Sequence, residues 1–263
     1  MTASYSREPP STLILGLRVH HFTEASLHEC IGAVIEGRRR ALIANANVHA
    51  LNLACRDAGF RRVLHRADYV FCDGAGVRLA ARLLGHSMPP RITYADWLPR
   101  LGAFCAERGF RLFLLGGRPG VAEEAARRLR EYAPALPVAG CHDGYFDKDP
   151  GSDANREVVA LVNRSSAHVL LVCFGMPAQE LWLARHWDEL SVNVGLTGGA
   201  ALDYVSGRLR RPPRWMTRCG LEWLGRLIIE PGRLWRRYLI GNPLFFLRLM
   251  RYHLRRGDEE NAR

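Results

Sequence analysis

One aspartate stands where acid–base chemistry could use it. Asp73 follows the apolar run YVFC and precedes Gly74 and Gly76. A carboxylate held at the end of a strand can accept a proton from a substrate hydroxyl. The same position also suits the N-cap of a following helix, and caps are far commoner than catalytic bases. From its position alone, Asp73 is therefore interpreted as a helix cap rather than as a catalytic base.

Amide side chains and glycines follow other apolar runs. Asn45 and Asn47 could hydrogen-bond a sugar or merely form turns. Gly116 and Gly117 lie between an apolar run and a helical pattern, where backbone N–H groups could cradle a diphosphate. Glycines at such turns also serve chain reversal, and the spacing misses the dinucleotide pattern GxGxxG.

Two further motifs have both a chemical and a structural interpretation. Gln179 and Glu180, in the first turn of a helical pattern, could face a ligand or just suit the helix dipole. Asp147-Lys148-Asp149 has the DxD spacing that holds a divalent metal in many sugar-nucleotide enzymes, but the following Pro150-Gly151 favours a surface turn. The histidines show no metal-ligand spacing. The residues therefore predict no metal site.

The elements that would position these residues alternate along the first 200 positions. Runs such as HVLLVCF and RLFLLGG are apolar nearly throughout, which is typical of strands covered on both faces of a parallel sheet. Strand–helix alternation predicts an α/β sheet, and ligands of such sheets bind beyond the carboxyl ends of the strands. The predicted strands are Leu13–Leu17, Ala41–Asn45, Tyr69–Cys72, Arg111–Leu115, Leu136–Cys141, Val169–Phe174 and Val192–Leu196. The predicted helices are Glu24–Glu36, Val48–Cys55, Val77–Leu84, Trp97–Glu107, Val121–Tyr132, Asn155–Asn163 and Ala178–Trp187.

The charge divides the chain into two parts. Of a net charge of +11, residues 206–263 carry +9, with 14 arginines against five acids, and residues 1–205 carry +2. The sequence therefore predicts a catalytic α/β domain over 1–205 and a basic helical appendage over 206–263. A strongly basic appendage implies an anionic partner, which could be membrane lipid, nucleic acid or phosphate.

In the appendage, aromatic rings alternate with arginines on short helical pieces that we expect to break at Pro231-Gly232 and Asn242-Pro243. Such a helix suits the headgroup layer of a membrane, where rings lie at the interface and guanidinium groups meet phosphates. The alternative is that the rings pack on the sheet domain and the arginines are solvated. Both can hold at once.

Composition excludes several classes of protein. With 48% hydrophobic and 24% charged residues, the chain is globular rather than disordered. No apolar run approaches the ~20 residues of a membrane-spanning helix, and the N-terminus lacks the features of a signal peptide, so a cytosolic location is expected. Seven cysteines without a CxxC pair predict neither a disulfide framework nor a zinc site.

Taken in order, five segments resemble the WecG/TagA/CpsF family of bacterial glycosyltransferases (glycosyltransferase family 26). They are DGAGVRLAARLLG, LLGGRPGVAEEAARRLR, GCHDGYF, GMPAQELW and GLEWLGRLIIEPGRLWRRYLIGNP, and the likeness extends from about residue 13 to about residue 249. The resemblance implies a Rossmann-like parallel sheet flanked by helices. It also implies inverting, metal-independent transfer of a hexose from a UDP-sugar to a polyprenyl-diphosphate-linked sugar, without a cofactor, at the cytoplasmic face of the membrane.

The resemblance also implies roles for individual residues and makes Asp73 a catalytic base rather than a cap. Asn47 and Arg91 match other active-site residues, and Tyr145, Gln179 and Asp203 match the UDP pocket. The tail arginines that would close over the site and face the lipid diphosphate are Arg226, Arg233 and Arg236. With Asn45, Gly116, Gly117 and Gly199 near the donor, these residues complete the expected site.

Some positions depart from the family pattern. Asn45 replaces a usual threonine, Tyr94 a usual glycine and Ala178 a usual lysine. Since Asn45 and Tyr94 would lie near the sugar, they leave its identity open among glucose, N-acetylmannosamine and its uronic acid, which all occur in the family. The near absence of lysine suggests a GC-rich genome, and for that reason alone an exopolysaccharide pathway is favoured over teichoic acid. The oligomeric state is also open, a homo-oligomer included.

Two other functions compete with this interpretation. A nucleic-acid-binding protein would explain the sequence pI of 9.8, but the positive charge is confined to the appendage. A UDP-sugar enzyme of another type, such as an epimerase, would need a nicotinamide cofactor, for which the dinucleotide fingerprint is missing. We therefore expect a UDP-sugar, a lipid-linked acceptor and an anionic membrane surface as partners, and no nucleic acid.

Overall fold

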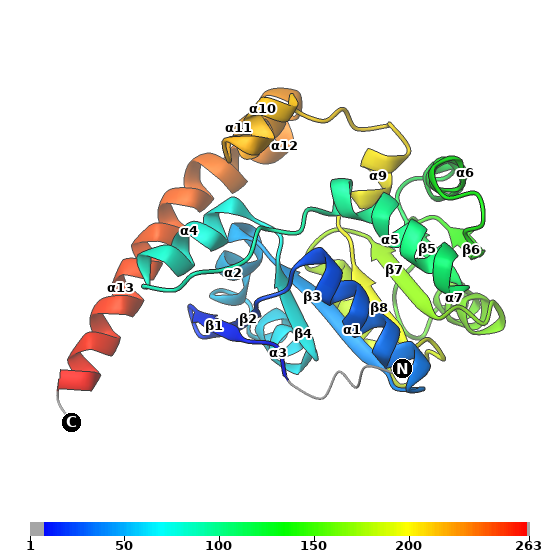
Figure 1. Ribbon diagram of the computed structural model, residues 1–263, viewed down its shortest axis with the longest axis horizontal. Helices are drawn as coiled ribbons and strands as arrows, with labels where there is room; N and C mark the ends of the chain where they lie inside the picture. Colours follow the sequence, from blue (N-terminus) through cyan, green and yellow to red (C-terminus); the bar gives the residue numbers. More distant parts are fainter. Residues whose placement is uncertain (1–7, 262–263) are drawn as a thin grey trace.

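A mostly parallel, eight-stranded sheet forms the centre of the protein (Figure 1). The computed structural model describes residues 8–261, without the side chains of residues 214, 218 and 255–261. The strands are β1 Ser11–Ile14, β2 Leu17–His20, β3 Ala41–Ala46, β4 Tyr69–Cys72, β5 Leu112–Gly116, β6 Val138–His142, β7 Val169–Cys173 and β8 Val194–Thr197. Their order across the sheet is β1-β2-β4-β3-β8-β7-β5-β6. All neighbours are parallel except β1 and β2. The predicted Rossmann-like α/β class is confirmed.

The first predicted strand is wrong in detail. Leu13–Leu17 is a hairpin rather than one strand, because Leu15 and Gly16 take φ angles of 51° and 81° and reverse the chain between β1 and β2. Two successive residues at positive φ are the geometry of the tight turns that join antiparallel strands. Glycine suits this conformation and leucine does not. Because a leucine occupies one of the two turn positions, the apolar run gives no sign of a turn.

Helices cover both faces of the sheet. One apolar core lies under α1 Glu24–Glu36, α5 Tyr94–Arg108, α6 Val121–Tyr132 and α9 Ala201–Val205. The other lies under α2 Val48–Ala54, α3 Ala58–Arg66, α4 Ala75–Leu83, α7 Asp153–Arg164 and α8 Ala178–Arg185. Along β5, Leu112 and Leu114 enter the first core, and Phe113 and Leu115 enter the second. This two-sided burial is why the strands read as continuous apolar runs.

One helix, α3, was not expected from the sequence. It buries only Phe60 and Leu64 and is otherwise rich in arginine, so its apolar pattern is short. Asp57 supplies the start signal, because its Oδ1 accepts a hydrogen bond from the backbone N–H of Phe60 at 2.9 Å.

Every element after residue 206 in the described part of the chain is helical. These elements are α10 Arg214–Arg218, α11 Glu222–Ile229, α12 Pro231–Trp235, a π-helical turn Arg236–Ile240 and α13 Gly241–Asn261. The predicted break at Pro231 is confirmed, whereas the one at Asn242-Pro243 is wrong. Pro243 lies in the first turn of α13, directly after the π-helical turn, where its missing N–H disturbs the helix least.

The long helix α13 docks on the second core through α2 and α4 (Figure 1). Phe245 is completely buried and Leu249 nearly so. Asn52 on α2 donates from Nδ2 to the carbonyl oxygen of Gly241 at 2.6 Å. Arg248 on α13 donates from Nη1 to the carbonyl oxygen and to Oδ1 of Asn52, at 3.0 and 2.7 Å. Asn52 and Arg248 thereby fix the last helix against the sheet domain.

Candidate active site

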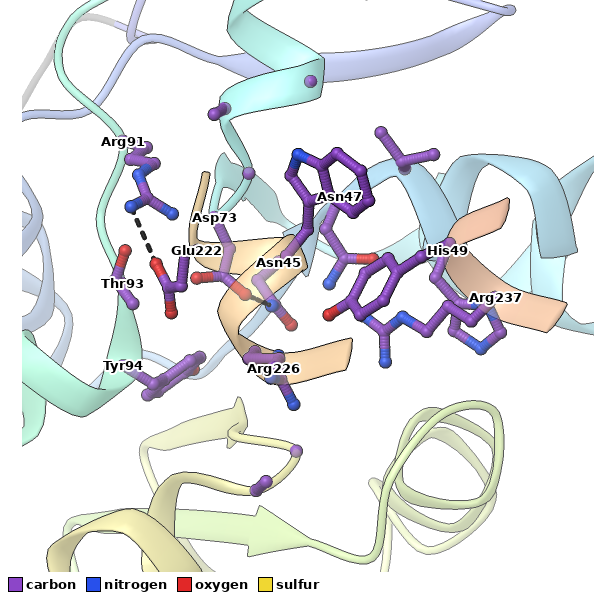
Figure 2. Close-up of a pocket in the computed structure, with 18 of the residues that line it drawn as sticks. Asn45, Asn47, His49, Asp73, Arg91, Thr93, Tyr94, Glu222, Arg226 and Arg237 are labelled. Carbon is purple, nitrogen blue, oxygen red and sulfur yellow. Dashed lines mark hydrogen bonds and ion pairs between the residues drawn. The ribbon is translucent and has the colours of Figure 1, made fainter. Parts of the chain in front are cut away.

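Two adjoining cavities lie at the carboxyl ends of the strands. The first, which we call the Asp73 cavity, has a volume of about 510 Å³ and lies at the ends of β3, β4 and β8 under α11, α12 and the π-helical turn (Figure 2). The second, the Asp203 cavity, has a volume of about 600 Å³ and lies at the ends of β5 and β7. Gly175, Gly199, Ala200 and Arg233 line both. A ligand can therefore reach from one cavity into the other along this shared wall.

Asp73 does not cap the helix that follows it. The N-cap of α4 is Gly74, without a side-chain hydrogen bond, so the interpretation of Asp73 as a cap is wrong. The Asp73 carboxyl instead faces the cavity, where its Oδ2 accepts a hydrogen bond from Asn45 Nδ2 at 2.8 Å (Figure 2). Burial and the nearby Glu222 carboxylate raise the Asp73 pKa to about 7, against the opposing effect of Arg91 and Arg226. A base with such a pKa accepts a proton effectively at neutral pH.

Glu222, from the appendage, is a site residue that the sequence reasoning missed. Its Oε2 lies 2.7 Å from Nη2 of Arg91, and both side chains are largely buried. Arg91 Nη2 also donates to the carbonyl oxygen of Thr217 at 3.2 Å. The sequence offers one signal for Glu222, which is an acid between apolar neighbours in an otherwise basic segment.

Buried guanidinium groups approach the Asp73 cavity from the appendage. Among the described residues, neither Arg226 Nε nor Arg237 Nε has a hydrogen-bond partner. The Arg226 guanidinium lies 5.5 Å from the centre of the Tyr204 ring, and burial lowers the pKa of Arg237. Buried cations without full hydrogen bonding are unfavourable, and an anionic ligand such as a phosphate would relieve both.

The three predicted tail arginines do not all reach the cavities. Arg226 and Arg233 line the Asp73 cavity, but Arg236 lies outside both cavities, exposed, with its guanidinium 5.2 Å from the centre of the Trp235 ring. Arg237 takes the inward position. Arg233 and Arg237 are four residues apart and share a helix face, which is the sequence signal that separates them from Arg236.

Asn47, a predicted catalytic residue, lines the Asp73 cavity and also caps α2. Its Oδ1 accepts a hydrogen bond from the backbone N–H of Ala50 at 3.0 Å. His49, two residues after Asn47, lines the same cavity, and burial together with Arg237 lowers its pKa to about 4. This histidine is therefore neutral at pH 7.

The predicted UDP-pocket residues divide into those that line the Asp203 cavity and those that support it. Gly117, Tyr145 and Asp203 line it. Gly116 does not, because its backbone packs so closely on β7 that a Cβ atom would lie 2.4 Å from the Cys173 carbonyl oxygen. Gln179 is completely buried, and its Oε1 accepts hydrogen bonds from the backbone N–H groups of Gly175 and Gly199, which form the shared wall.

A model of the Glycosyl transferase WecG/TagA/CpsF family matches residues 12–259. The chain belongs to this family of glycosyltransferases.

Two curated relatives are similar over most of their length to this WecG/TagA/CpsF family member. The protein named N-acetylglucosaminyldiphosphoundecaprenol N-acetyl-beta-D-mannosaminyltransferase from Bacillus subtilis (strain 168) is 30% identical over 208 residues, which cover 78% of this chain and 77% of the relative. The protein of the same name from Bacillus spizizenii (strain ATCC 23059 / NRRL B-14472 / W23) is 32% identical over 207 residues, with the same coverage.

In this family member, the DxD segment forms the surface turn that its sequence predicts. Asp147 Oδ1 accepts from the backbone N–H of Asp149, and Asp149 Oδ1 accepts from that of Gly151. Lys148 turns inward to the Asp203 cavity, donates to the carbonyl oxygens of Gly144 and Phe146, and has a pKa lowered by burial. Within residues 8–261, no group of three or more His, Cys, Asp or Glu side chains is placed to hold a metal ion.

Proposed function

We propose that this glycosyltransferase moves a hexose from a UDP-sugar to a polyprenyl-diphosphate-linked sugar, with inversion and without a metal, in the synthesis of a cell-surface polysaccharide or exopolysaccharide. The observation that carries the proposal is a buried carboxyl, Asp73, with a pKa of about 7, in an arginine-lined cavity that adjoins a second cavity. The names of both relatives specify an acceptor sugar on diphosphoundecaprenol.

In this proposal the donor nucleotide occupies the Asp203 cavity. Gly117 and the loop carrying Gly144 and Tyr145 offer backbone groups to it, and Lys148 and Arg233 offer positive charge. The donor sugar then lies along the shared wall, at Gly175 and Gly199, and points toward Asp73. This placement agrees with the roles that the family resemblance implies for Tyr145 and Asp203.

Asp73 acts as the general base. Its carboxylate takes the proton from an acceptor hydroxyl while that oxygen forms a bond to the anomeric carbon on the face opposite UDP. The bond from the anomeric carbon to the UDP oxygen breaks at the same time, and its electron pair leaves with the diphosphate. Attack from the opposite face inverts the anomeric configuration.

The appendage supplies positive charge in the proposed mechanism. Arg226, Arg233 and Arg237 line the Asp73 cavity, where the acceptor diphosphate and the departing UDP bring negative charge. Pre-positioned cations stabilise such charge as it develops and perform the task that a metal performs in other glycosyltransferases. Residues 1–205 thus hold donor and base, and residues 206–263 supply three arginines to the Asp73 cavity.

The outer surface of the appendage suits an anionic membrane. Its large apolar side chains that are exposed are Trp215, Ile228, Ile229, Trp235, Leu239, Ile240, Leu247, Met250 and Leu254. Exposed rings and aliphatic chains among arginines are typical of helices that lie in the headgroup layer. No helix within the described residues is long and apolar enough to cross a bilayer. We propose peripheral attachment at the cytoplasmic face of the cell membrane.

The proposal is tested by UDP release from a panel of UDP-sugars, with and without a short polyprenyl-diphosphate-sugar acceptor, in the presence and absence of EDTA. UDP-N-acetylmannosamine heads the panel because both relatives are named as N-acetylmannosaminyltransferases. We expect acceptor-dependent release with one donor, unaffected by EDTA. Release that requires a divalent metal would refute the metal-free mechanism, and no release with any donor would refute the proposed reaction.

The Asp73→Asn variant tests the base. General base catalysis contributes about 10²–10⁴-fold, so we expect kcat to fall by that factor while UDP binding is unchanged. A fall of only a few-fold would show that Asp73 is not the base. Binding to anionic vesicles, but not to duplex or single-stranded nucleic acid at moderate salt, would exclude the nucleic-acid-binding alternative.

A further inference from the structure

A second buried carboxyl, Glu180 on α8, lies under the floor of the site and has no part in the mechanism above. Its side chain is completely buried. Oε1 accepts a hydrogen bond from Gln179 Nε2 at 2.7 Å, but Oε2 has no hydrogen-bond partner among the described residues. A buried carboxylate oxygen without a partner is strongly unfavourable, so the protonation state of this group needs an explanation.

For the neighbours of Glu180, the surrounding hydrogen bonds determine which atoms donate and which accept. Gln179 Oε1 accepts from two backbone N–H groups, which leaves its NH2 group to donate to Glu180 Oε1. On the other side, the Thr197 hydroxyl lies beside the Glu180 carboxyl. Thr197 Oγ1 is also 3.3 Å from Asn45 Oδ1.

The direction of the bonds follows from Asp73. An ionised Asp73 only accepts, so Asn45 donates to it from Nδ2 and its Oδ1 can only accept. The Thr197 hydroxyl must then give its one proton to Asn45 Oδ1. Toward Glu180, Thr197 Oγ1 then has only a lone pair to offer. If Glu180 were ionised, two hydrogen-bond acceptors, Thr197 Oγ1 and the carboxylate, would face each other without a proton between them.

We propose that Glu180 is a positioning residue that acts in its protonated form and donates through Oε2 to Thr197, so that hydrogen bonds run from Glu180 through Thr197 and Asn45 to Asp73 in one direction. The inference rests on the proposed role of Asp73 as the base. The series of bonds holds one N–H donor on Asp73 Oδ2 and leaves Oδ1 free for the acceptor hydroxyl. No proton moves along it, because an amide does not relay protons.

Burial also favours the protonated form of Glu180. It raises the pKa of Glu180 to about 7, against the opposing effects of Gln179, of the backbone N–H of Glu180 itself and of Thr197. The other titratable groups around it are the Tyr94 phenol from α5 and, next to Tyr94, the Cys173 thiol of β7 and Asp73 itself. Burial raises the pKa values of Tyr94 and Cys173 far above neutral. No cation in this set compensates a charge on Glu180.

The experiment compares Glu180→Gln with Glu180→Met. Glutamine reproduces the protonated acid, since its NH2 donates to Thr197 and its oxygen accepts from Gln179, whereas methionine does neither. We expect kcat of Glu180→Gln to remain within about threefold of wild type, and kcat of Glu180→Met to fall about tenfold or more, with the UDP dissociation constant unchanged. If Glu180→Gln were as impaired as Glu180→Met, Glu180 would not be a neutral donor.

Thr197 provides a second test that does not alter Glu180. Thr197→Val keeps the shape but removes the hydroxyl, and we expect about the same loss of kcat as in Glu180→Met, again without a change in UDP binding. Thr197→Ser restores the hydroxyl and should recover most of the rate. Near-wild-type kcat in both Glu180→Met and Thr197→Val would overturn the proposal.

The pH profile separates positioning from a merely structural role. Raising the pH through about 7 ionises Glu180, so the wild-type rate should fall on the alkaline side, and Glu180→Gln should lose that fall. An identical alkaline fall in both proteins would contradict the proposal.

Two readouts do not need turnover and therefore distinguish failure of this inference from failure of the proposed reaction. The infrared difference spectrum of wild type minus Glu180→Gln, near pH 6, should show the carbonyl band of a protonated carboxylic acid. The urea midpoint of wild type should fall more than that of Glu180→Gln as the pH rises from about 5 to 8, because a raised folded-state pKa stabilises at low pH only. Absence of the band together with equal pH dependence would show that Glu180 is ionised.

Discussion

The guanidinium of Arg91 and the carboxylate of Glu222 lie 2.7 Å apart beside Asp73, and they come from different parts of the chain. Arg91 belongs to the loop before α5 in the sheet domain, and Glu222 begins α11 in the appendage. Glu222 raises the Asp73 pKa, and Arg91 and Arg226 lower it. Docking of the appendage therefore sets the protonation of the proposed base as well as covering the cavity.

Glu222→Gln should make the enzyme tolerate lower pH. Removal of the carboxylate removes a charge that raises the Asp73 pKa, and it frees Arg91 to lower that pKa further. The acid limb of kcat/KM, expected near pH 7 in wild type, should move down by about one unit. The measurement is the pH–rate profile, with Glu131→Gln on the exposed face of α6 as the control. An unchanged or raised limb would contradict the electrostatic role of Glu222.

Arg237→Met and Arg236→Met should differ sharply although the residues are adjacent. Arg237 is buried at the Asp73 cavity, and losing a charge-assisted hydrogen bond of about 1.5–3 kcal/mol should reduce kcat/KM for the lipid-linked acceptor about tenfold or more. Arg236 is exposed beside Trp235, so its loss should weaken binding to anionic vesicles and leave turnover of a short soluble acceptor unchanged. Equal effects on soluble-acceptor kinetics would refute the inward placement of Arg237.

Arg248→Met should loosen α13. The variant removes two hydrogen bonds to Asn52 and leaves Asn52 buried without them, at a cost of about 1–3 kcal/mol. Hydrogen exchange should become faster in residues 241–254, while β3 and β8 stay protected. Arg251→Met, at an exposed position of the same helix, is the matched control. If both variants exchanged alike, the Asn52–Arg248 contact would not hold the helix.

Gly116→Ala should destabilise the protein much more than Gly120→Ala. Both glycines have positive φ angles, 139° and 83°, but only at Gly116 would a Cβ atom meet backbone, 2.4 Å from the Cys173 carbonyl oxygen. Gly120→Ala has open space and should cost only the left-handed strain of about 1–2 kcal/mol. Urea unfolding measures both, and comparable midpoints would show that β5 and β7 can separate at this point.

The sequence predicts the sheet well because its strands are buried on both faces and their polar ends fall at one edge. Asn45, Asp73 and Gly199 could be placed together for this reason. The hairpin at Leu15-Gly16 could not, since its turn lies inside an apolar run. Helix α3 has an apolar pattern of only three residues, Phe60, Val63 and Leu64, which is too short to stand out from its surroundings.

The appendage was harder to predict because its residues act through tertiary contacts. The apolar neighbours of Glu222 mark it as unusual, but its role follows only from its contact with Arg91 and its effect on Asp73, and both of these residues lie far from it in sequence. The spacing of four residues puts Arg233 and Arg237 on one helix face, but that this face turns toward the cavity depends on how the π-helical turn packs on the sheet domain. Gln179 could be selected from its motif, but its role in holding Gly175 and Gly199 requires the fold.

The place of β8 has a consequence for folding during synthesis. Of the strands in the described chain, β8 is the last to leave the ribosome, yet it lies in the middle of the sheet, between β3 and β7. Until residues 194–197 emerge, β1–β4 and β5–β7 are two half-sheets, each with an unpaired edge that is hydrophobic on both faces. Such edges readily pair with other chains. We therefore expect nascent chains that stall before β8 to depend on chaperones, and closure of the sheet to be a late step that the appendage can only follow.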